Sequence, residues 1–294
     1  MQALRTPDSA FDNLPDYSFK PNYIDLKEGL RMHYVDEGQG PLVLLLHGEP
    51  SWSYLYRFMI ADLVKKGYRC VAPDLIGFGK SDKWDDQSAY TYQSHRDWLF
   101  ELVTGLGLKN INLFCQDWGG LLGLRIAGEH PELFDRIAAS NTFLPTGDIP
   151  PGEAFLKWRD FSQNVSKLPI GKIIQGATVR KLTAGEITAY NAPYPEENFK
   201  AAARKFPLLV PITPDDPAAA ANRIAWEGLK KFEKPFLTLF GDSDPVTKGA
   251  DLLFRRYVPG AKKQPHATIE KGGHFIQEDK PHELCDHLHA WITR

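Results

Sequence analysis

The chain has 294 residues, a net charge of −2 and an apolar fraction of 43%. This length suits one large domain, or one domain with an insertion, that folds without a metal or a disulfide. The balanced charge argues against nucleic acid or an anionic membrane as the main partner. No stretch is apolar for long enough to span a bilayer, and the N-terminus lacks the apolar part of a signal peptide. Cys70, Cys115 and Cys285 lie far apart, which fits a reducing cytoplasm.

Short β-rich runs alternate with helical patterns over the first 144 residues. The run PLVLLLHG (41–48) is nearly all apolar, as a strand buried on both faces should be. Further strands are predicted in LRMHYVDEG and over 68–74, 111–116 and 136–141, and helices over 54–67, 94–107 and 118–131. This alternation predicts a mostly parallel sheet with helices on both faces.

The alternation breaks between residues 145 and 227, where prolines in loops separate amphipathic helical pieces and no clear strand is present. It resumes with two β-rich runs and ends with an amphipathic helix, over 234–244, 264–274 and 281–292. We therefore predict an α/β core formed by residues 1–144 and 228–294, with residues 145–227 as a helical cap over the sheet.

The segment NLFCQDWGG (112–120) is an apolar strand followed by a sharp turn, two glycines and a helix. This is the setting of a nucleophile elbow, in which the side chain at the turn stands above the sheet. Here that position holds Asp117, and the positive end of the helix dipole favours a carboxylate there. Aspartate is also a common helix N-cap, which is the alternative interpretation. The order of the other candidate residues favours a nucleophile.

A base and an acid follow in the chain order expected of this fold. His274 stands in KGGHF after the last predicted strand, where two glycines allow a close backbone approach. Asp242 and Asp244 in LFGDSDPVT both qualify as the acid. The position three residues after the glycine favours Asp244 and leaves Asp242 as a turn residue. Asn141, after the preceding strand, carries no charge and cannot take this role.

The segment LLLHGEPSW (44–52) ends a strand in His-Gly and continues into Glu-Pro. This fold builds half of its oxyanion hole in such a loop. The backbone N–H groups of Glu49 and Trp118 are the predicted donors. We expect His47 to be structural and to bond with the loop backbone.

These segments together resemble the haloalkane dehalogenases of the α/β-hydrolase fold. The resemblance covers nearly the whole chain and is carried by HGEP, QDWGG, NAPYPEENFKAAARKFP and GGHFIQED. HG-x-P is widespread and D-W-G also occurs in epoxide hydrolases, but their combination with an acid after the later strand is more specific. The resemblance implies a cofactor-free, metal-free monomer. It would convert a haloalkane and water into an alcohol and halide through an ester on Asp117.

The chain looks like the subgroup of that family in which two tryptophans hold the halide. Trp118 matches the position beside the nucleophile. Trp158 matches the family's tryptophan early in the cap, whereas Trp226 lies close to the return to the core and is expected to pack there. The resemblance thus implies Trp118 and Trp158 as the halide ligands.

Two other functions stay open from the sequence. An epoxide hydrolase would use the same three catalytic residues with cap tyrosines, for which Tyr190 and Tyr194 are available. A non-catalytic ligand receptor could keep the same scaffold. A serine esterase is disfavoured because no G-x-S-x-G occurs. The segment PHELCDHLH lacks the spacing of a metal site and is predicted to be a histidine-rich helix surface.

Overall fold

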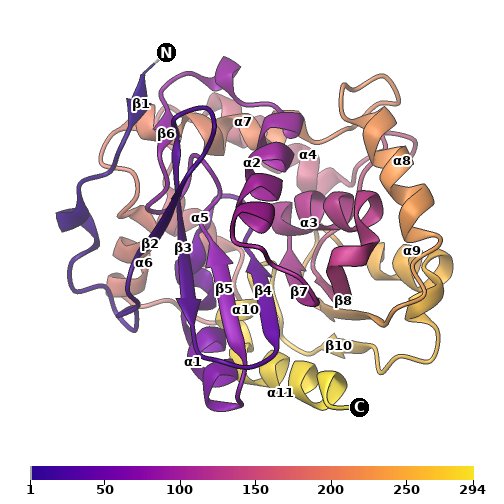
Figure 1. Ribbon diagram of the computed structural model, residues 1–294. Helices are drawn as coiled ribbons and strands as arrows, with labels where there is room; N and C mark the ends of the chain where they lie inside the picture. The colour runs from indigo at the N-terminus through magenta and orange to yellow at the C-terminus, as the bar shows by residue number, and fades with distance from the viewer. Residues whose placement is uncertain (1) are drawn as a thin grey trace.

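The computed structural model describes residues 2–294, and eight of the strands in that range form one sheet (Figure 1). Their order is β10-β9-β8-β7-β4-β5-β3-β2. The strands are β2 (Asn22–Asp25), β3 (Arg31–Glu37), β4 (Leu42–Leu46), β5 (Arg69–Pro73), β7 (Ile111–Gln116), β8 (Phe134–Ser140), β9 (Phe236–Gly241) and β10 (Ala267–Ile269). In the part of the sheet with the order β10-β9-β8-β7-β4-β5, each pair of neighbouring strands is parallel. At the other edge, β3 is antiparallel to β5 and β2 is antiparallel to β3. The predicted mostly parallel sheet is confirmed.

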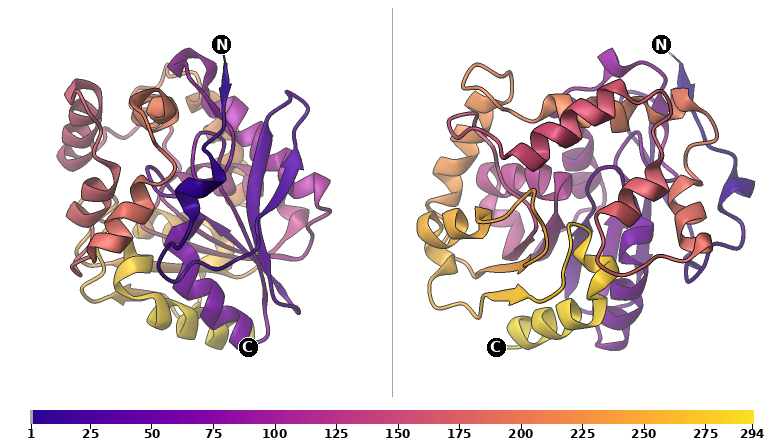
Figure 2. Two further views of the ribbon diagram at one scale, coloured as in Figure 1. Left: turned by 90° about the vertical axis from the view of Figure 1, so that its left-hand side faces the viewer. Right: turned by 180° about the vertical axis from the view of Figure 1, so that it is seen from behind.

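The sheet has helices on both faces, as the alternation predicts (Figures 1 and 2). On one face α1 (Arg57–Lys65) packs against α11 (Pro281–Ile292). On the other face α2 (Tyr92–Gly105) packs against α3 (Trp118–Glu129), and α9 (Ala250–Tyr257) follows β9. The five residues of β4 are all buried, as a central strand covered on both faces requires.

One expected strand is shorter in the structure, and three short strands were not expected. The predicted strand over 264–274 is only three residues long, because β10 ends at Ile269 and a loop leads to His274. The sequence prediction did not include β2, which is half-exposed and has no buried apolar run. It also did not include the two-stranded ribbon of β1 (Ala3–Leu4) and β6 (Lys83–Trp84).

Residues 145–227 contain helices and no strand among the residues that the structure describes. They form α4 (Glu153–Asn164), α5 (Ile170–Gly176), α6 (Ala184–Asn191), a 3₁₀ helix (Glu197–Lys200), α7 (Ala201–Leu209) and most of α8 (Ala219–Leu229). Figure 2 shows α4 to α7 gathered on one side of the core, where α4 packs on α7 and α5 on α6.

The last helix of this segment, α8, packs on α3 of the sheet layer. The contact is close because both helices have a glycine there: a Cβ on Gly228 would lie 1.8 Å from the carbonyl oxygen of Gly128. The predicted boundary at residue 227 falls inside α8. We therefore propose that the cap, built of α4 to α7, ends before α8.

In the described part of the chain, no helix combines the length and the apolar character needed to cross a membrane.

Candidate active site

Asp117 lies at the turn between β7 and α3, with φ 50° and ψ −127°. A positive φ is uncommon for a residue with a side chain and marks a tight turn. The turn fits because glycines follow: a Cβ on Gly119 would lie 2.1 Å from the Leu46 carbonyl oxygen, and one on Gly120 would lie 2.0 Å from Thr142 Oγ1. Among the described residues, the Asp117 side chain accepts no capping hydrogen bond from α3. The N-cap interpretation is therefore not supported.

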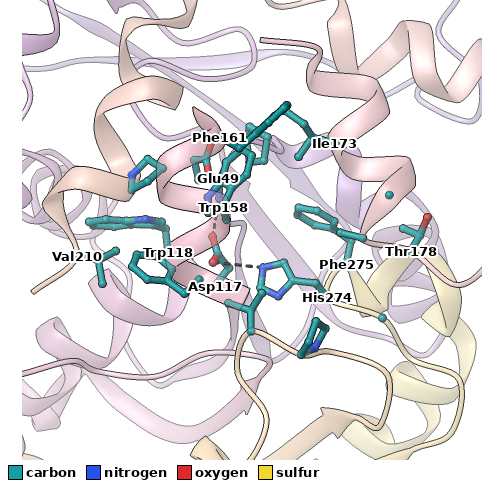
Figure 3. Close-up of a pocket in the computed structure, with 18 of the residues that line it drawn as sticks. Glu49, Asp117, Trp118, Trp158, Phe161, Ile173, Thr178, Val210, His274 and Phe275 are labelled. Carbon is teal, nitrogen blue, oxygen red and sulfur yellow. Dashed lines mark hydrogen bonds and ion pairs between the residues drawn. The ribbon is translucent and has the colours of Figure 1, made fainter. Parts of the chain in front are cut away.

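The structure brings His274 between Asp117 and Asp244. Nε2 of His274 lies 3.3 Å from Oδ2 of Asp117, and Nδ1 lies 3.0 Å from Oδ2 of Asp244 (Figure 3 shows the first pair). Asp244 is 2% exposed and also accepts from the Val246 N–H at 2.9 Å and from the Thr247 hydroxyl. Asp242, the other candidate acid, is exposed and accepts from the Lys271 N–H instead.

The two carboxylates change the acid–base behaviour of the histidine between them. Burial lowers the pKa of His274, but the charges and hydrogen bonds of Asp244 and Asp117 outweigh it and raise that pKa well above its ordinary value. Burial also raises the pKa of Asp244, and here His274 and Thr247 outweigh it, so the pKa falls below its ordinary value. An ionised Asp244 is therefore available to stabilise an imidazolium.

Side chains at the ends of β7 and β8 hold the loop that carries His274. Gln116 donates to the His274 carbonyl oxygen at 3.0 Å, and Asn141 donates to the Gly273 carbonyl oxygen at 2.7 Å. Asn141 also accepts from the Gly241 N–H at 2.8 Å, so it connects the loops after β9 and β10. The sequence prediction kept Asn141 from the role of acid and gave no sign of this positioning contact.

The loop after β4 faces the Asp117 carboxylate. The N–H of Glu49 donates to Oδ1 of Asp117 at 2.7 Å, and a Cβ on Gly48 would lie 2.2 Å from that oxygen. The N–H of Trp118 is the first of α3, and the first N–H groups of a helix have no partner within it. His47 is bonded to backbone on both sides, to the Gly48 carbonyl oxygen at 2.9 Å and the Leu75 N–H at 3.0 Å.

A cavity of about 480 Å³ lies between this centre and the helices of residues 145–227. Asp117, Glu49 and His274 line its base, and Trp118 from α3 and Trp158 from α4 lie beside the carboxylate (Figure 3). The rest of the wall is largely apolar and includes Leu121, Phe143, Phe155, Phe161, Ile173, Val210, Val246 and Phe275. Such a cavity suits a small apolar molecule whose reactive carbon meets a carboxylate.

The side chain of Glu49 is a polar group of this cavity that the sequence prediction did not include. It is buried, and the nearby Trp158 indole lowers its pKa only in part. Burial and the charge of Asp117 raise the pKa of Glu49 well above its ordinary value. Burial and the Asp117 charge thus both favour the protonated form of Glu49, which carries no negative charge beside the Asp117 carboxylate.

Among the described residues, no group of three or more His, Cys, Asp and Glu side chains is placed to hold a metal ion. Two histidines of α11 have other contacts. His282 lies 3.1 Å from an Asp62 carboxylate oxygen, and His289 lies 3.0 Å from the Tyr68 hydroxyl. Cys285 of the same helix is buried and unpaired with another cysteine.

The chain is similar to proteins of known family along its whole length. A family model described as the alpha/beta hydrolase fold matches residues 41–281. A haloalkane dehalogenase of Psychrobacter cryohalolentis is 54% identical, and the alignment covers 99% of this chain and 98% of that protein. This chain belongs to the haloalkane dehalogenase family. A family member from Mycolicibacterium paratuberculosis is 48% identical over 99% of this chain and 98% of that protein.

Solved structures of haloalkane dehalogenases have the same fold. The haloalkane dehalogenase DpaA of Paraglaciecola agarilytica, described as tetrameric, superposes with a TM-score of 0.91. It is 36% identical, and the superposition covers 100% of this chain and 98% of DpaA. The resemblance inferred from the sequence motifs is confirmed. A more distant relative, 32% identical over 95% of this chain and 98% of its own length, is a cis-3-alkyl-4-alkyloxetan-2-one decarboxylase of Xanthomonas campestris.

The tryptophans of this haloalkane dehalogenase family member lie in two different settings. Trp118 and Trp158 line the cavity above Asp117. The Trp226 indole donates to the Leu144 carbonyl oxygen at 2.8 Å and stacks on Phe254, outside that cavity. Of the two candidate cap tryptophans, only Trp158 can therefore donate to a group bound beside the nucleophile.

The tyrosines that an epoxide hydrolase would need lie elsewhere. The Tyr190 hydroxyl donates to the Glu278 carboxylate, and Tyr194 is buried. Among the residues that the structure describes, no tyrosine lines the cavity of Asp117. This arrangement offers no phenol to protonate an epoxide oxygen there.

Proposed function

We propose that this chain hydrolyses haloalkanes to an alcohol and a halide ion through a covalent ester on Asp117. One observation carries the proposal: the Asp117 carboxylate faces an apolar cavity, and two indoles line that cavity beside it. No tyrosine of the described chain lines this cavity. An sp³ carbon that bears a halogen has no carbonyl to attack, so displacement must occur in line. A carboxylate in a desolvated cavity is a competent nucleophile for this displacement.

In the first step, Oδ2 of Asp117 attacks the carbon and the halide leaves with the bonding electron pair. Oδ1 is held by the Glu49 N–H and stays as the carbonyl oxygen of the new ester. The leaving halide develops its charge in an apolar site, where the indole N–H groups of Trp118 and Trp158 donate to it without bulk water. His274 takes no part in this step.

In the second step, Nε2 of His274 removes a proton from water, and the oxygen of that water bonds to Cγ of the Asp117 ester. The negative charge that develops on Oδ1 is stabilised by the backbone N–H groups of Glu49 and Trp118. Removing one such donor typically lowers a rate by about 10²- to 10³-fold. Asp244 stabilises the imidazolium, which then returns the proton to the departing alcohol oxygen.

Halide release from 1-bromobutane, with 1,2-epoxybutane as the alternative substrate, tests this proposal. We expect bromide and 1-butanol in equal amounts over many turnovers. Trp158→Phe should lower kcat/KM by about 10-fold or more, since a hydrogen bond to a charged group contributes about 1.5–3 kcal/mol. Trp226→Phe, the matched control outside the cavity, should leave turnover close to that of the unaltered protein.

Two results would overturn the proposal. Diol formation from the epoxide without bromide release from the bromoalkane would indicate an epoxide hydrolase. Binding of 1-bromobutane without repeated turnover would indicate a receptor. We further propose a cytoplasmic monomer, in contrast to the tetramer described for DpaA. Light scattering of the purified chain measures that oligomeric state.

A further inference from the structure

A four-residue helix, α10 (Ile276–Asp279), begins two residues after His274 and ends at a carboxylate that contacts the cap. Oδ1 of Asp279 accepts from the N–H groups of Val179 at 2.9 Å and Arg180 at 2.8 Å. Oδ2 accepts from the N–H of Gly273 at 2.8 Å. One carboxylate therefore connects the segment after α5 to the residue that precedes His274.

Both segments joined by Asp279 form part of the cavity wall. Residues 177–179 line it from the cap and residues 273–275 from the core. The two segments also meet directly, because the Phe275 N–H donates to the Ala177 carbonyl oxygen at 3.3 Å. A Cβ on Gly273 would lie 2.7 Å from that same carbonyl oxygen and 3.0 Å from Oδ2 of Asp279. The glycine before His274 is thus required by its contact with the cap.

The neighbouring residue, Glu278, strengthens the same connection. Its carbonyl oxygen accepts from Nε of Arg180 at 2.6 Å, and its carboxylate contacts the guanidinium groups of Arg180 and Arg57. Glu278 is 2% exposed, and bonds to charged groups in such a dry site are stronger than at the surface. The segment 177–180 is therefore held firmly against α10. The Asp279 carboxylate bonds this segment and the Gly273 N–H together, so the position of Gly273 depends on that of the segment.

We propose that Asp279 is a positioning residue for catalysis, which fixes His274 by bonding its loop to the cap segment 177–180. This inference rests on the proposed function, because His274 acts only in hydrolysis of the ester. Asp117 is placed by β7, α3 and the Glu49 N–H, and in the described chain none of these forms a hydrogen bond with the Asp279 carboxylate. Loss of the Asp279 carboxylate should therefore slow the hydrolysis of the ester and leave its formation intact.

Asp279→Asn tests this inference with Asp216→Asn as the matched control. The asparagine amide would point a donor either at the Gly273 N–H or at the N–H groups of residues 179 and 180, so one contact is lost in either orientation. Asp216 also accepts two backbone N–H groups, from Ile212 and Thr213 at 2.7 Å each, but contacts no residue of the His274 loop. Both contacts of Asp216 are to Oδ2, so an asparagine there can keep them through its amide oxygen, and Asp216→Asn controls for the loss of a carboxylate charge. Unfolding in urea should therefore show a larger loss of stability in Asp279→Asn than in Asp216→Asn.

The readout is the rate of each chemical step after rapid mixing with excess 1-bromobutane. For Asp279→Asn we expect a first equivalent of bromide at nearly the normal rate, then turnover slowed on the order of 10- to 100-fold, because a small displacement of a catalytic group has an effect of this size. Mass spectrometry of the intact protein should show the butyl ester accumulating. Asp216→Asn should show neither effect. Amide hydrogen exchange at residues 273–275 should be faster in Asp279→Asn than in Asp216→Asn.

Unchanged turnover in Asp279→Asn would overturn the inference, and so would an equal loss in both steps, which indicates a general structural role. Unchanged exchange at residues 273–275 would overturn it independently of any turnover. Absence of bromide release by the unaltered protein would instead contradict the proposed function itself, so the two failures are distinguishable.

Discussion

The backbone N–H of Glu49 lies 2.7 Å from Oδ1 of Asp117, so the two oxygens of this carboxylate are not equivalent. Oδ1 is held in the loop after β4, while Oδ2 lies 3.3 Å from Nε2 of His274. An N–H that already bonds Oδ1 in the resting enzyme needs no movement to stabilise charge on that atom later. Oδ2 is thus the oxygen that should bond to the substrate carbon.

The first prediction follows the oxygen atoms through one turnover. In water enriched in heavy oxygen, with less bromoalkane than enzyme, the alcohol should contain only light oxygen, because it leaves with Oδ2 of Asp117. The heavy oxygen should appear in the Asp117 carboxylate, where mass spectrometry of the peptide detects it. An alcohol that carries solvent oxygen in this first turnover would mean that water attacks the substrate directly.

The second prediction separates the two steps by pH. Asp117 and Asp244 both raise the pKa of His274 against the opposing effect of burial. Ester formation removes the charge of Asp117, so the pKa of His274 should fall in the intermediate and free its Nε2 to act as a base. As the pH decreases, His274 becomes protonated again and hydrolysis should slow, while the first equivalent of halide is still released. Stopped-flow halide release across a pH series measures both steps.

Asp244→Asn provides the control for this pH dependence. Without the charge of Asp244 the pKa of His274 should be lower, so the decline in hydrolysis should move to lower pH. The maximal rate should also fall, on the order of 10²- to 10⁴-fold, because the imidazole loses its orienting partner. A decline that stays at the same pH in this variant would contradict the assignment of Asp244.

For residues that a local motif defines, the sequence was sufficient to select side chains that the structure brings together. Asp117 stands in a strand-turn-helix pattern, and His274 follows two glycines near the last strand. The choice between Asp242 and Asp244 depended on spacing alone. The structure brings Asp244 to His274 and leaves Asp242 exposed, bonded to the Lys271 N–H.

Contacts between distant segments could not be predicted in this way. Asp279 follows His274 closely in the chain, but its partners Val179 and Arg180 belong to the cap, and nothing in either segment specifies the pairing. The same limit applies to α8, whose place against α3 depends on facing glycines at 128 and 228. Local patterns define elements and turns, whereas contacts of this kind depend on how those elements pack.

The third prediction concerns the space around the nucleophile. A Cβ on Gly48 would lie 2.2 Å from Oδ1 of Asp117, so Gly48→Ala must displace either the loop or the carboxylate. We expect kcat/KM to fall on the order of 10²-fold, because small displacements of reacting groups have effects of this size. Gly152→Ala is the control, since a Cβ there meets no atom within 4 Å. Equal activity in the two variants would show that this contact does not fix the nucleophile.

The fourth prediction concerns a buried ionic cluster between the core and the cap. Arg57, whose side chain is 0% exposed, donates to Glu278 at 2.6 Å and to Glu186 at 2.7 Å. Arg57→Met would leave these carboxylates with fewer partners, and we expect the free energy of unfolding to fall by about 3–5 kcal/mol. Lys230→Met removes an exposed pair with Glu227 and should cost about 1 kcal/mol or less. Urea unfolding at neutral pH measures both, and similar losses would contradict the prediction.

The same cluster predicts a dependence of stability on acid. Burial raises the pKa of Glu186, but its bonds to Arg180 and other groups outweigh burial and lower the pKa from 4.5 to about 2. Above pH 4.5 this carboxyl is ionised in both the folded and the unfolded chain, and its full stabilisation is present. As the pH falls from 4.5 towards 2, only the unfolded chain takes up the proton, so this stabilisation is lost.

Glu186→Gln should therefore be less stable than the unaltered protein at pH 7, and urea unfolding should show that difference shrinking below pH 4.5. A difference that stays constant down to the lowest pH at which both proteins are folded would mean that the Glu186 charge does not stabilise the contact between cap and core.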